Sequence, residues 1–391
     1  MNQKQRTIYL DYSASTPLDP RVEAVMRPYQ SERFGNASSA HAQGQAAEYA
    51  IEDARERAAQ LLNCRPAEIV FTSGGTESDN LALRGAGLAI RRQTGRSRIV
   101  TTRVEHSAVS KTAEQMAEWL GFEAAFVPVD ACGRAGVDAV EAAAADAALV
   151  SLMLANNEVG TLQDVQMLAE AAHRQGALFH SDAVQAGGQT RLDVQALGVD
   201  LLSLSAHKFY GPKGVGLLFV RQGTPLVPVN TGGGHERGLR AGTPNTPGIV
   251  GMVRALELAT EEHDARANHL LARRDQLIAG ILGGIAGAYL TGHASERLPG
   301  HASFVFDGVD GNLLLMHLDA RGVMASSGSA CHTGNPEPSE VLLAMGYPAG
   351  LALSGLRLTA GVHTTEAEIA DAIGAVIESV EAVRRLQTAY A

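Results

Sequence analysis

The chain has 391 residues, of which 45% are hydrophobic and 19% charged, so it can form at least one large core and divide into two domains. Its net charge is −10, and its 32 lysine and arginine residues form no basic run, which argues against nucleic acid or an anionic membrane surface as the partner. These features favour small-molecule chemistry.

The N-terminal stretch MNQKQRTIYLDYS has no apolar signal-peptide region, and no uncharged run of about 18 apolar residues follows it. We therefore expect a cytoplasmic protein with no membrane partner. The three cysteines, Cys64, Cys132 and Cys331, are far apart and form no CxxC pair, which argues against a disulfide framework or a cysteine-rich zinc site. We interpret them as thiols and expect no metal.

From about residue 50 to residue 260, β-branched apolar runs alternate with alanine-rich helical patterns, which is typical of βα units around a mainly parallel sheet. Seven strands are predicted, at residues 68–72, 98–102, 123–129, 148–154, 178–182, 201–205 and 215–220. Amphipathic segments between them, such as 46–62 and 162–175, predict helices. Ligands of such sheets bind at the carboxyl ends of the strands, so we expect the site there.

The last third of the chain has a different pattern. One long helical pattern covers residues 250–283, and apolar stretches at 301–306 and 356–359 then precede a closing helical pattern at 365–388. This order predicts a smaller α+β unit joined to the α/β unit by a long helix.

The predicted fold is therefore α/β, of fold type I, with a mainly parallel seven-stranded sheet in a large domain over residues 17–262. Residues 1–16 and 263–391 are expected to form the small domain. The glycine-rich stretch 231–242 (TGGGHERGLRAG) has too many glycines for a helix or a central strand. We expect an exposed functional loop there.

The segment 71–80 (FTSGGTESDN) is a predicted strand that runs into glycines and then into a polar helix start. Backbone N–H groups at Gly75 and a hydroxyl at Thr76 form a good phosphate cradle, because glycine lets the backbone close around an anion and the helix dipole adds positive potential. The alternative is an ordinary βα turn with a helix N-cap, which explains the same residues.

The segment 179–185 (FHSDAVQ) is an apolar strand that ends in an acid and, three residues later, an amide. Asp182 is placed to keep the ring nitrogen of pyridoxal phosphate protonated, so that the ring acts as an electron sink. Gln185 could donate to the phenolic oxygen of the ring. An aspartate that caps the next helix is the alternative.

The segment 202–212 (LSLSAHKFYGP) delivers Ser205, His207 and Lys208 at the end of a strand, before the chain turns. A lysine at the end of a buried strand is costly unless it is used, and a Schiff-base amine is a common use. Ser205 and His207 are natural phosphate ligands beside it. A lysine on a surface loop is the alternative, which agrees less well with the two segments above.

The order SGGTES, EHSAV, ANNEVG, HSDAVQ and SAHKFYGPKG closely resembles the fold-type I, class-V aminotransferase superfamily and, within it, the cysteine desulfurases. The resemblance covers nearly the whole chain, from Tyr9 to Arg357. It implies pyridoxal phosphate as the cofactor, with these roles: Lys208 as the Schiff-base lysine, His106 stacked on the ring, Asp182 at the ring nitrogen, Gln185 at the phenolic oxygen, and Thr76, Ser205 and His207 at the phosphate.

The same resemblance implies a homodimer. It implies that Thr243 reaches the phosphate in the neighbouring subunit and that Asn157 lies close to cofactor and substrate. It also implies that Asn36, in the segment FGNASSAH, assists at the substrate carboxylate.

The segment 325–334 (ASSGSACHTG) separates the desulfurases from the transaminases of this fold. Cys331 stands in a segment rich in glycine and serine, whereas structural cysteines are usually buried as small hydrophobes, so it is a nucleophile candidate. The implied reaction converts L-cysteine into L-alanine and leaves a persulfide on Cys331, while Arg357 holds the substrate carboxylate.

Residues 326–345 resemble the longer catalytic loop of the desulfurases that serve iron–sulfur assembly. A cluster scaffold or another sulfur carrier is therefore the expected acceptor. Three alternatives remain open: a selenocysteine lyase, an aminotransferase that needs no thiol, and a scaffold without cofactor.

Overall fold

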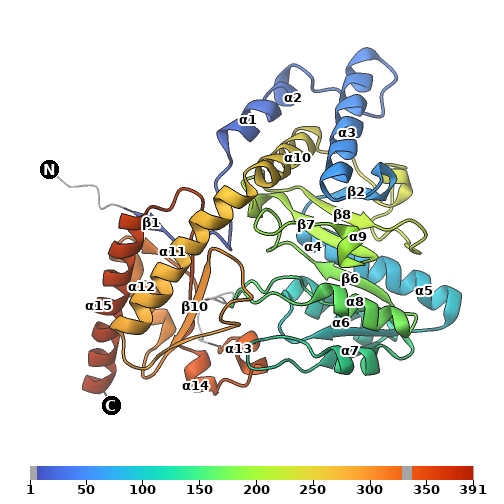
Figure 1. The fold of residues 1–391 in the computed structure, drawn as a ribbon. Helices are drawn as coiled ribbons and strands as arrows, with labels where there is room; N and C mark the ends of the chain where they lie inside the picture. Colours follow the sequence, from blue (N-terminus) through green and yellow to red (C-terminus); the bar gives the residue numbers. More distant parts are fainter. Residues whose placement is uncertain (1–6, 328–336, 391) are drawn as a thin grey trace.

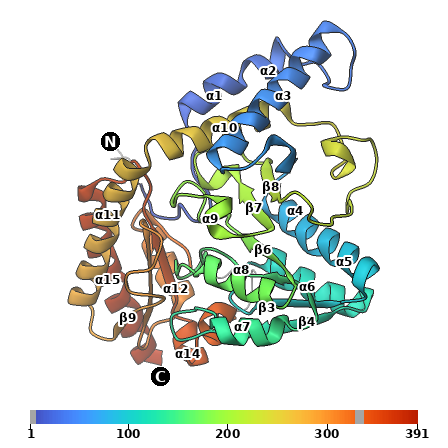
Figure 2. The ribbon, with the colours of Figure 1, turned by 45° about the vertical axis from the view of Figure 1, so that its right-hand side comes forward.

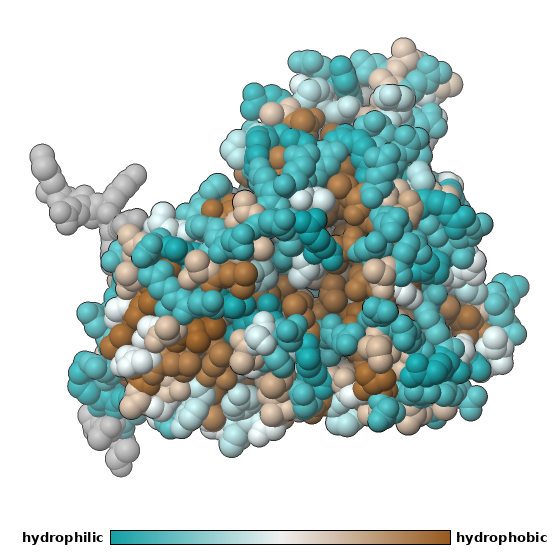
Figure 3. Space-filling view, in the orientation of Figure 1, coloured by the Kyte–Doolittle hydropathy of each residue, from teal (hydrophilic) through white to brown (hydrophobic). Residues whose placement is uncertain are grey.

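A computed structural model describes residues 7–327 and 337–390, so the predicted nucleophile Cys331 lies outside the described residues. Figure 1 shows a layered α/β part that carries the large sheet and, beside it, a smaller part that contains the first described strand and the last helix. No helix in the described ranges is long and apolar enough to span a membrane. In the view of Figure 3, hydrophobic residues gather near the middle of the visible face, between the two parts.

The large sheet has seven strands, and all of them run parallel except β8, which is antiparallel to both of its neighbours. This confirms the predicted mainly parallel α/β sheet. In spatial order the strands are β2 (Ile69–Thr72), β8 (Gly216–Val220), β7 (Leu201–Ser205), β6 (Leu178–Asp182), β5 (Ala147–Ser151), β3 (Arg98–Thr102) and β4 (Glu123–Val127).

Helices cover both faces of this sheet (Figure 2). One face packs its apolar side chains, such as Phe179 and Leu204, against helices α3 (Ala42–Leu61), α8 (Val165–Arg174) and α10 (Thr246–Glu261). The other face is covered by α4 (Gly75–Asn80), the π-helical turn η2 (Leu81–Ala86) and α6 (Ser107–Leu120). Because neighbouring strand residues point to opposite faces, the central strands contribute apolar side chains to the cores on both sides of the sheet.

A second apolar core lies in the smaller part. It is built on an antiparallel three-stranded sheet and also takes in Ile8 and Leu10 from the start of the chain. Its elements are β9 (Ala288–Leu290), β10 (His301–Phe306), β12 (Leu356–Thr359), α11 (His263–Gly284), α12 (Gly311–Asp319) and α15 (Glu366–Tyr390). A separate parallel pair joins β1 (Ile8–Tyr9) to β11 (Val323–Met324).

The prediction of one long helix over residues 250–283 was wrong. Helix α10 ends at Glu261 and α11 begins at His263, because Glu262 leaves the helical conformation with φ −98° and ψ 7°. Its carboxylate accepts from Arg21 and Arg266, so the break is fixed by ion pairs that hydrophobic periodicity does not report.

The remaining elements are short and connect the layers. They are α1 (Pro20–Met26), α2 (Pro28–Ser31), α5 (Gly87–Thr94), α7 (Val137–Ala144), α9 (Val194–Leu197), α13 (Glu340–Ala344), α14 (Ala349–Ala352) and the 3-10 turns η1 (Pro66–Glu68), η3 (Ala206–Lys208) and η4 (Glu236–Gly238).

The glycine-rich loop at residues 231–242 is largely exposed, as predicted, and several side-chain contacts anchor it, among them the ion pair of Arg240 with Glu77 and the hydrogen bond from Arg237 to the Ile69 carbonyl. The Glu236 side chain is buried and pairs with Arg55 of α3, with 2.7 Å between Oε2 and Nη1. The same carboxylate accepts from the backbone N–H of Phe71 at 2.9 Å, so the loop is fixed to the edge strand β2.

Candidate functional site

Lys208 lies at the carboxyl edge of the large sheet. Strand β7 ends at Ser205, and the 3-10 turn that follows brings Lys208 to this edge. Its Nζ donates to the carbonyl of Ser13 and, at 3.1 Å, to that of Ala14. Burial, with the nearby charge of Arg357, lowers the pKa of the Lys208 amine to about 8, so the amine loses its proton more readily than an exposed lysine does.

Asp182 ends the neighbouring strand β6 and is only 5% exposed. Its Oδ1 accepts from the backbone N–H of Val184 at 2.8 Å. Burial raises the pKa of this carboxyl, while the charges of His106 and Lys208 lower it. A cationic group bound against Asp182 would therefore favour its ionised form.

Gln185 lies in the turn after Asp182 and is buried. Its Nε2 donates to the Ser13 carbonyl at 2.9 Å, so Gln185 and Lys208 share one acceptor. Its Oε1 is buried and has no partner in the described structure. An unsatisfied buried oxygen costs free energy, which indicates that a ligand group belongs beside it.

His106 is the N-cap of α6, and its side chain is exposed. The Nδ1 atom accepts from the backbone N–H of Ala108 at 3.1 Å. The neutral ring therefore carries its proton on Nε2. The ring lies near enough to Asp182 for its protonated form to lower the pKa of that carboxyl.

The predicted phosphate cradle follows β2. Gly74 has φ 154°, which side chains rarely tolerate, and a Cβ there would point into space bordered by Ser205 Oγ at 3.8 Å. A Cβ on Gly75 would lie 2.6 Å from Val184 Cγ2, so this position also requires glycine. Thr76 is exposed in the first turn of α4.

His207 is half-buried beside Lys208. Burial and the charges of Lys208 and Lys213 lower the pKa of its imidazole to about 4, so the ring is neutral at physiological pH. Its Nδ1 lies 3.3 Å from Ser15 Oγ. A neutral imidazole can still donate one hydrogen bond to an anion.

Arg357 projects from β12 and is 5% exposed. Its Nη1 donates to the carbonyl of Asn157 and its Nη2 to Asp11 Oδ1, each at 2.7 Å. The Nε of Arg357 and the Oδ1 of Asn157 are both buried without partners in the described structure. An arginine and an amide with unused polar atoms are suited to an amino-acid substrate.

The structure does not bring every predicted residue to this point. Asn36 is exposed in the loop between α2 and α3, where its Oδ1 accepts from Ser38 N at 3.0 Å. Thr243 is exposed and lines a different pocket of about 60 Å³ with Ser73 and Arg240. Within residues 7–327 and 337–390, neither Asn36 nor Thr243 forms a hydrogen bond or ion pair with Lys208.

Cys331 lies outside the described residues. Ser326, a few positions earlier, is described and pairs with Arg357, whose backbone N–H donates to the Ser326 carbonyl at 2.6 Å.

The sequence predictions missed the N-terminal segment that covers Lys208. Thr16 holds this segment against the lysine turn, because its Oγ1 and its backbone N–H both donate to the His207 carbonyl at 3.0 Å. Asp11 belongs to the same segment and pairs with Arg357. The polar run LDYSASTP directly after a short apolar stretch was the available signal.

The predictions also missed three buried polar residues near Asp182, namely Asp79, Glu105 and His180. Each of the three stands in a segment whose neighbouring residues were predicted to bind the cofactor. Nothing in one sequence separates such residues from ordinary capping or surface groups.

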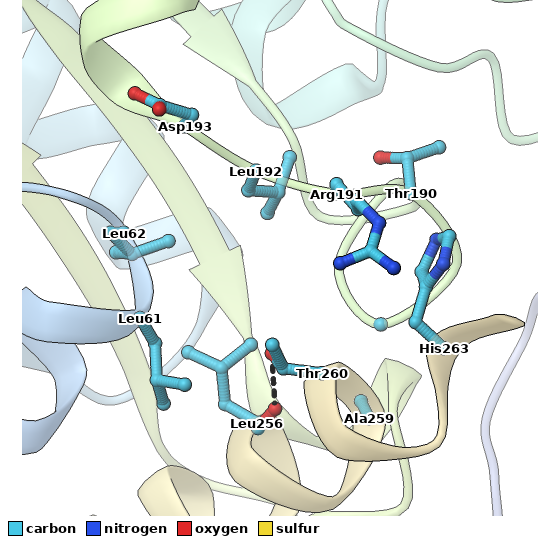
Figure 4. A pocket seen from close by; sticks show the side chains of 11 residues that line it. Leu61, Leu62, Thr190, Arg191, Leu192, Asp193, Leu256, Ala259, Thr260 and His263 are labelled. Atoms are coloured by element: carbon cyan, nitrogen blue, oxygen red, sulfur yellow. Dashed lines mark hydrogen bonds between the residues drawn. The ribbon is translucent and has the colours of Figure 1, made fainter.

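A separate pocket of about 170 Å³ lies beyond the end of α10 (Figure 4). Arg191, Asp193 and His263 line it together with leucines. None of the predicted site residues lines this pocket. We therefore place the candidate site at Lys208.

Comparisons with known proteins were made on the whole chain. The signature of the family described as Aminotransferase class-V matches residues 8–371. The cysteine desulfurase IscS of Dictyoglomus turgidum is 43% identical over 383 residues, which are 98% of this chain and 96% of that protein.

Solved structures agree with this result. A NifS-like protein superposes with a TM-score of 0.89 at 36% identity, covering 96% of this chain and 100% of its own. A structure described as SspA in complex with cysteine has a TM-score of 0.79 at 33% identity, covering 92% of this chain and 100% of its own.

Proposed function

The chain belongs to the class-V aminotransferase family, and on that premise we propose that it is a cysteine desulfurase that uses pyridoxal phosphate. One observation carries the proposal: Lys208, Asp182 and Gln185 meet at the carboxyl edge of the sheet, with Arg357 close enough for its charge to act on Lys208. That SspA, a relative of similar fold, was solved with cysteine supports the same substrate here.

The described residues fit this cofactor. The unpartnered Oε1 of Gln185 can accept from a ring hydroxyl group, and the space beside Gly74, which a Cβ would fill, leaves room for a phosphate; the predicted donation from Gln185 would need its Nε2, which donates to the Ser13 carbonyl here. The residues that would hold it are His106 and Asp182 at the ring, Gln185 at its oxygen, Gly75, Thr76, Ser205 and His207 at the phosphate, and Lys208 at the aldehyde carbon. When bound, pyridoxal phosphate supplies an electron sink for negative charge at the α-carbon of an amino acid.

Lys208 would move the substrate's α-proton. Its amine is already poised near neutrality, and burial keeps water from competing for the proton. Asp182 would hold a proton on the ring nitrogen through an ion pair, because its carboxylate is buried and has few other partners.

Arg357 would bind the substrate carboxylate. Asp11 and the Asn157 carbonyl already hold its two Nη atoms and so fix the plane of the guanidinium, while Nε remains available as a donor. The free Oδ1 of Asn157 can accept from the substrate.

Cys331 would accept the sulfur. Its thiolate forms a bond to the substrate sulfur as the carbon–sulfur bond breaks, and the three-carbon remainder takes up a proton and leaves as L-alanine. The persulfide then passes to an acceptor protein, such as a cluster scaffold or another sulfur carrier.

The wider assignments are also proposals. Thr243 would reach the phosphate in the neighbouring subunit of a homodimer, and Asn36 would assist at the substrate carboxylate; both residues are exposed. We propose a cytoplasmic location. We also propose a large domain at residues 17–262 and a small one at residues 1–16 and 263–391.

The test is to assay the purified protein with L-cysteine for alanine and sulfide, together with its visible absorbance. We expect a cofactor band that Lys208→Ala abolishes, and sulfide release that Cys331→Ala abolishes while the band remains. A Cys331→Ala protein that keeps full amino-group transfer to an added acceptor would indicate a transaminase. Alanine release from selenocysteine but not from cysteine, or a colourless protein that cannot take up the cofactor, would contradict the proposal.

A further inference from the structure

A row of polar side chains lies beneath Asp182 on one face of the large sheet. Phe179 of β6 packs on the opposite face, so His180 and Asp182 share this one. On the neighbouring strand β7, Ser203 is the cross-strand partner of Asp182. The third strand, β5, contributes Ser151 at its carboxyl end.

These side chains form one hydrogen-bonded chain. His180 lies at its centre, with Nδ1 2.8 Å from Ser151 Oγ and Nε2 2.9 Å from Ser203 Oγ. The Ser203 hydroxyl also bonds to the carboxyl group of Asp79, which belongs to α4. The second oxygen of Asp79 lies 3.7 Å from His180 Nε2 and has no hydrogen-bond partner in the described structure.

This hydrogen-bonded row of side chains contains no lysine or arginine that could balance a negative charge on Asp79. Asp79 is 1% exposed, and within the described ranges no lysine or arginine forms an ion pair with it or with the nearby Glu105. Burial and the charges of Asp182 and Glu105 raise the pKa of Asp79 well above its ordinary value, and they outweigh the hydrogen bond with Ser203, which acts in the opposite direction. Burial also raises the pKa of Glu105 to about 8 and lowers that of His180 to about 3.

Three buried carboxyl groups this close together cannot all ionise. Asp182 is the one on which the charges of His106 and Lys208 act. The nearby charges that act on Asp79 and Glu105 come from carboxyl groups, Asp182 among them, and not from a cation. The negative charge of the group therefore belongs on Asp182.

We propose that Asp79 is a positioning residue that keeps its proton and donates a hydrogen bond to Ser203, so that the chain through His180 to Ser151 stays neutral and the negative charge stays on Asp182, where the cofactor's ring nitrogen would bind. This inference rests on the proposed cofactor site. It also fixes the direction of every bond: Asp79 donates to Ser203, Ser203 donates to His180 Nε2, and His180 Nδ1–H donates to Ser151. If Asp79 were ionised, each bond would run the other way and His180 would carry its proton on Nε2.

The binding test compares Asp79→Ala with Asp79→Asn. The amide keeps a donor toward Ser203 but cannot carry a negative charge, whereas alanine removes the donor. We expect Asp79→Ala and Ser203→Ala to raise the Kd for pyridoxal phosphate about tenfold, and Asp79→Asn to stay within about threefold of wild type. Ser181→Ala is the matched control, because Ser181 is buried on the other face of β6 and its hydroxyl has no partner in the described structure.

Equal losses in Asp79→Asn and Asp79→Ala would overturn the proposal, because they would show that the charge is needed. Wild-type affinity in both Asp79→Ala and Ser203→Ala would overturn it as well. If Asp79→Ala does not fold, Ser203→Ala carries the comparison, with thermal unfolding as the check on folding.

The tautomer of His180 provides a readout that needs no cofactor. In full-length protein with ¹⁵N-labelled histidine, assigned with a His180→Gln variant, we expect the proton on Nδ1 both with and without pyridoxal phosphate. A proton on Nε2 would overturn the assignment for Asp79. If wild-type protein binds no cofactor, the proposed function fails, while this measurement still decides where the Asp79 proton lies.

Discussion

At the scale of single residues, the two basic side chains of the site influence each other. The charge of Arg357 helps to lower the pKa of Lys208, while Asp182 and Asp11 act in the opposite direction. Asp11 also holds Nη2 of Arg357 at 2.7 Å. The pKa of the Lys208 amine and the binding of the substrate carboxylate by Arg357 therefore depend on the same few charged groups.

The rate at which cofactor-free protein takes up pyridoxal phosphate tests the state of Lys208. Only the neutral amine attacks an aldehyde, so the rate should rise with pH, by about tenfold per unit, and level off above the pKa of about 8. Arg357→Gln should move this midpoint upward and Arg357→Lys should not, because lysine keeps the charge. Stopped-flow absorbance follows the reaction. A rate that still rises near pH 10 would contradict the low pKa.

Arg357→Lys tests the binding of the substrate carboxylate separately. Lysine keeps the charge but loses the planar fork, so KM for L-cysteine should rise by roughly 10- to 100-fold, as expected for hydrogen bonds to a charged group. Arg191→Lys is the control, because Arg191 is exposed and pairs with Asp264 outside the site. Steady-state alanine release measures both variants, and an unchanged KM in Arg357→Lys would place the substrate carboxylate elsewhere.

At the scale of elements, the strands that carry the site were predictable from the sequence. Strands β3, β6 and β7 have the predicted ends, because each is an apolar run closed by polar residues at the sheet edge. The break between α10 and α11 was not predictable, since ion pairs of Glu262 fix it. Nor was the closure of Ser13 over Lys208, which depends on contacts between distant parts of the chain.

The glycine-rich loop should depend on the buried ion pair of Glu236 with Arg55. Glu236 and Arg237 both have positive φ, 48° and 56°, so the loop needs the pair with Arg55 to hold this conformation. The two partners are 5% and 4% exposed, and removing one partner of such a pair costs about 3–5 kcal/mol. Glu236→Ala should therefore lower the free energy of unfolding by about that amount and expose the loop to trypsin.

The matched variant for this prediction is Asp264→Ala, which breaks the exposed pair with Arg191 and should cost less than about 1 kcal/mol. Urea unfolding and limited proteolysis measure both variants. Equal stability of the two variants would show that the buried pair does not anchor the loop.

At the scale of the whole molecule, the site draws on both cores. The segment after β1 leaves the second core at Leu10, pairs with Arg357 through Asp11, and then covers Lys208 with Ser13 and Ala14. The start of the chain therefore links the small sheet to the lysine of the large one.

Thr16→Val tests this link with little change in shape. The Thr16 hydroxyl donates to the His207 carbonyl at 3.0 Å and accepts from Tyr210 N at 2.7 Å, so its loss should cost about 1–3 kcal/mol of stability and weaken cofactor binding. Thr190→Val, whose hydroxyl makes one bond at 3.3 Å to Ala186, is the control. Thermal unfolding and cofactor titration should separate the two variants, and equal behaviour would mean that the segment does not depend on Thr16.

The most direct test of the function is the intact mass of the protein after brief incubation with L-cysteine, followed by peptide mapping. The account predicts one added sulfur atom on Cys331, formed together with one alanine and lost on treatment with a thiol reductant. Alanine formed while Cys331 stays unmodified, or sulfur carried by Cys64 or Cys132 instead, would contradict it.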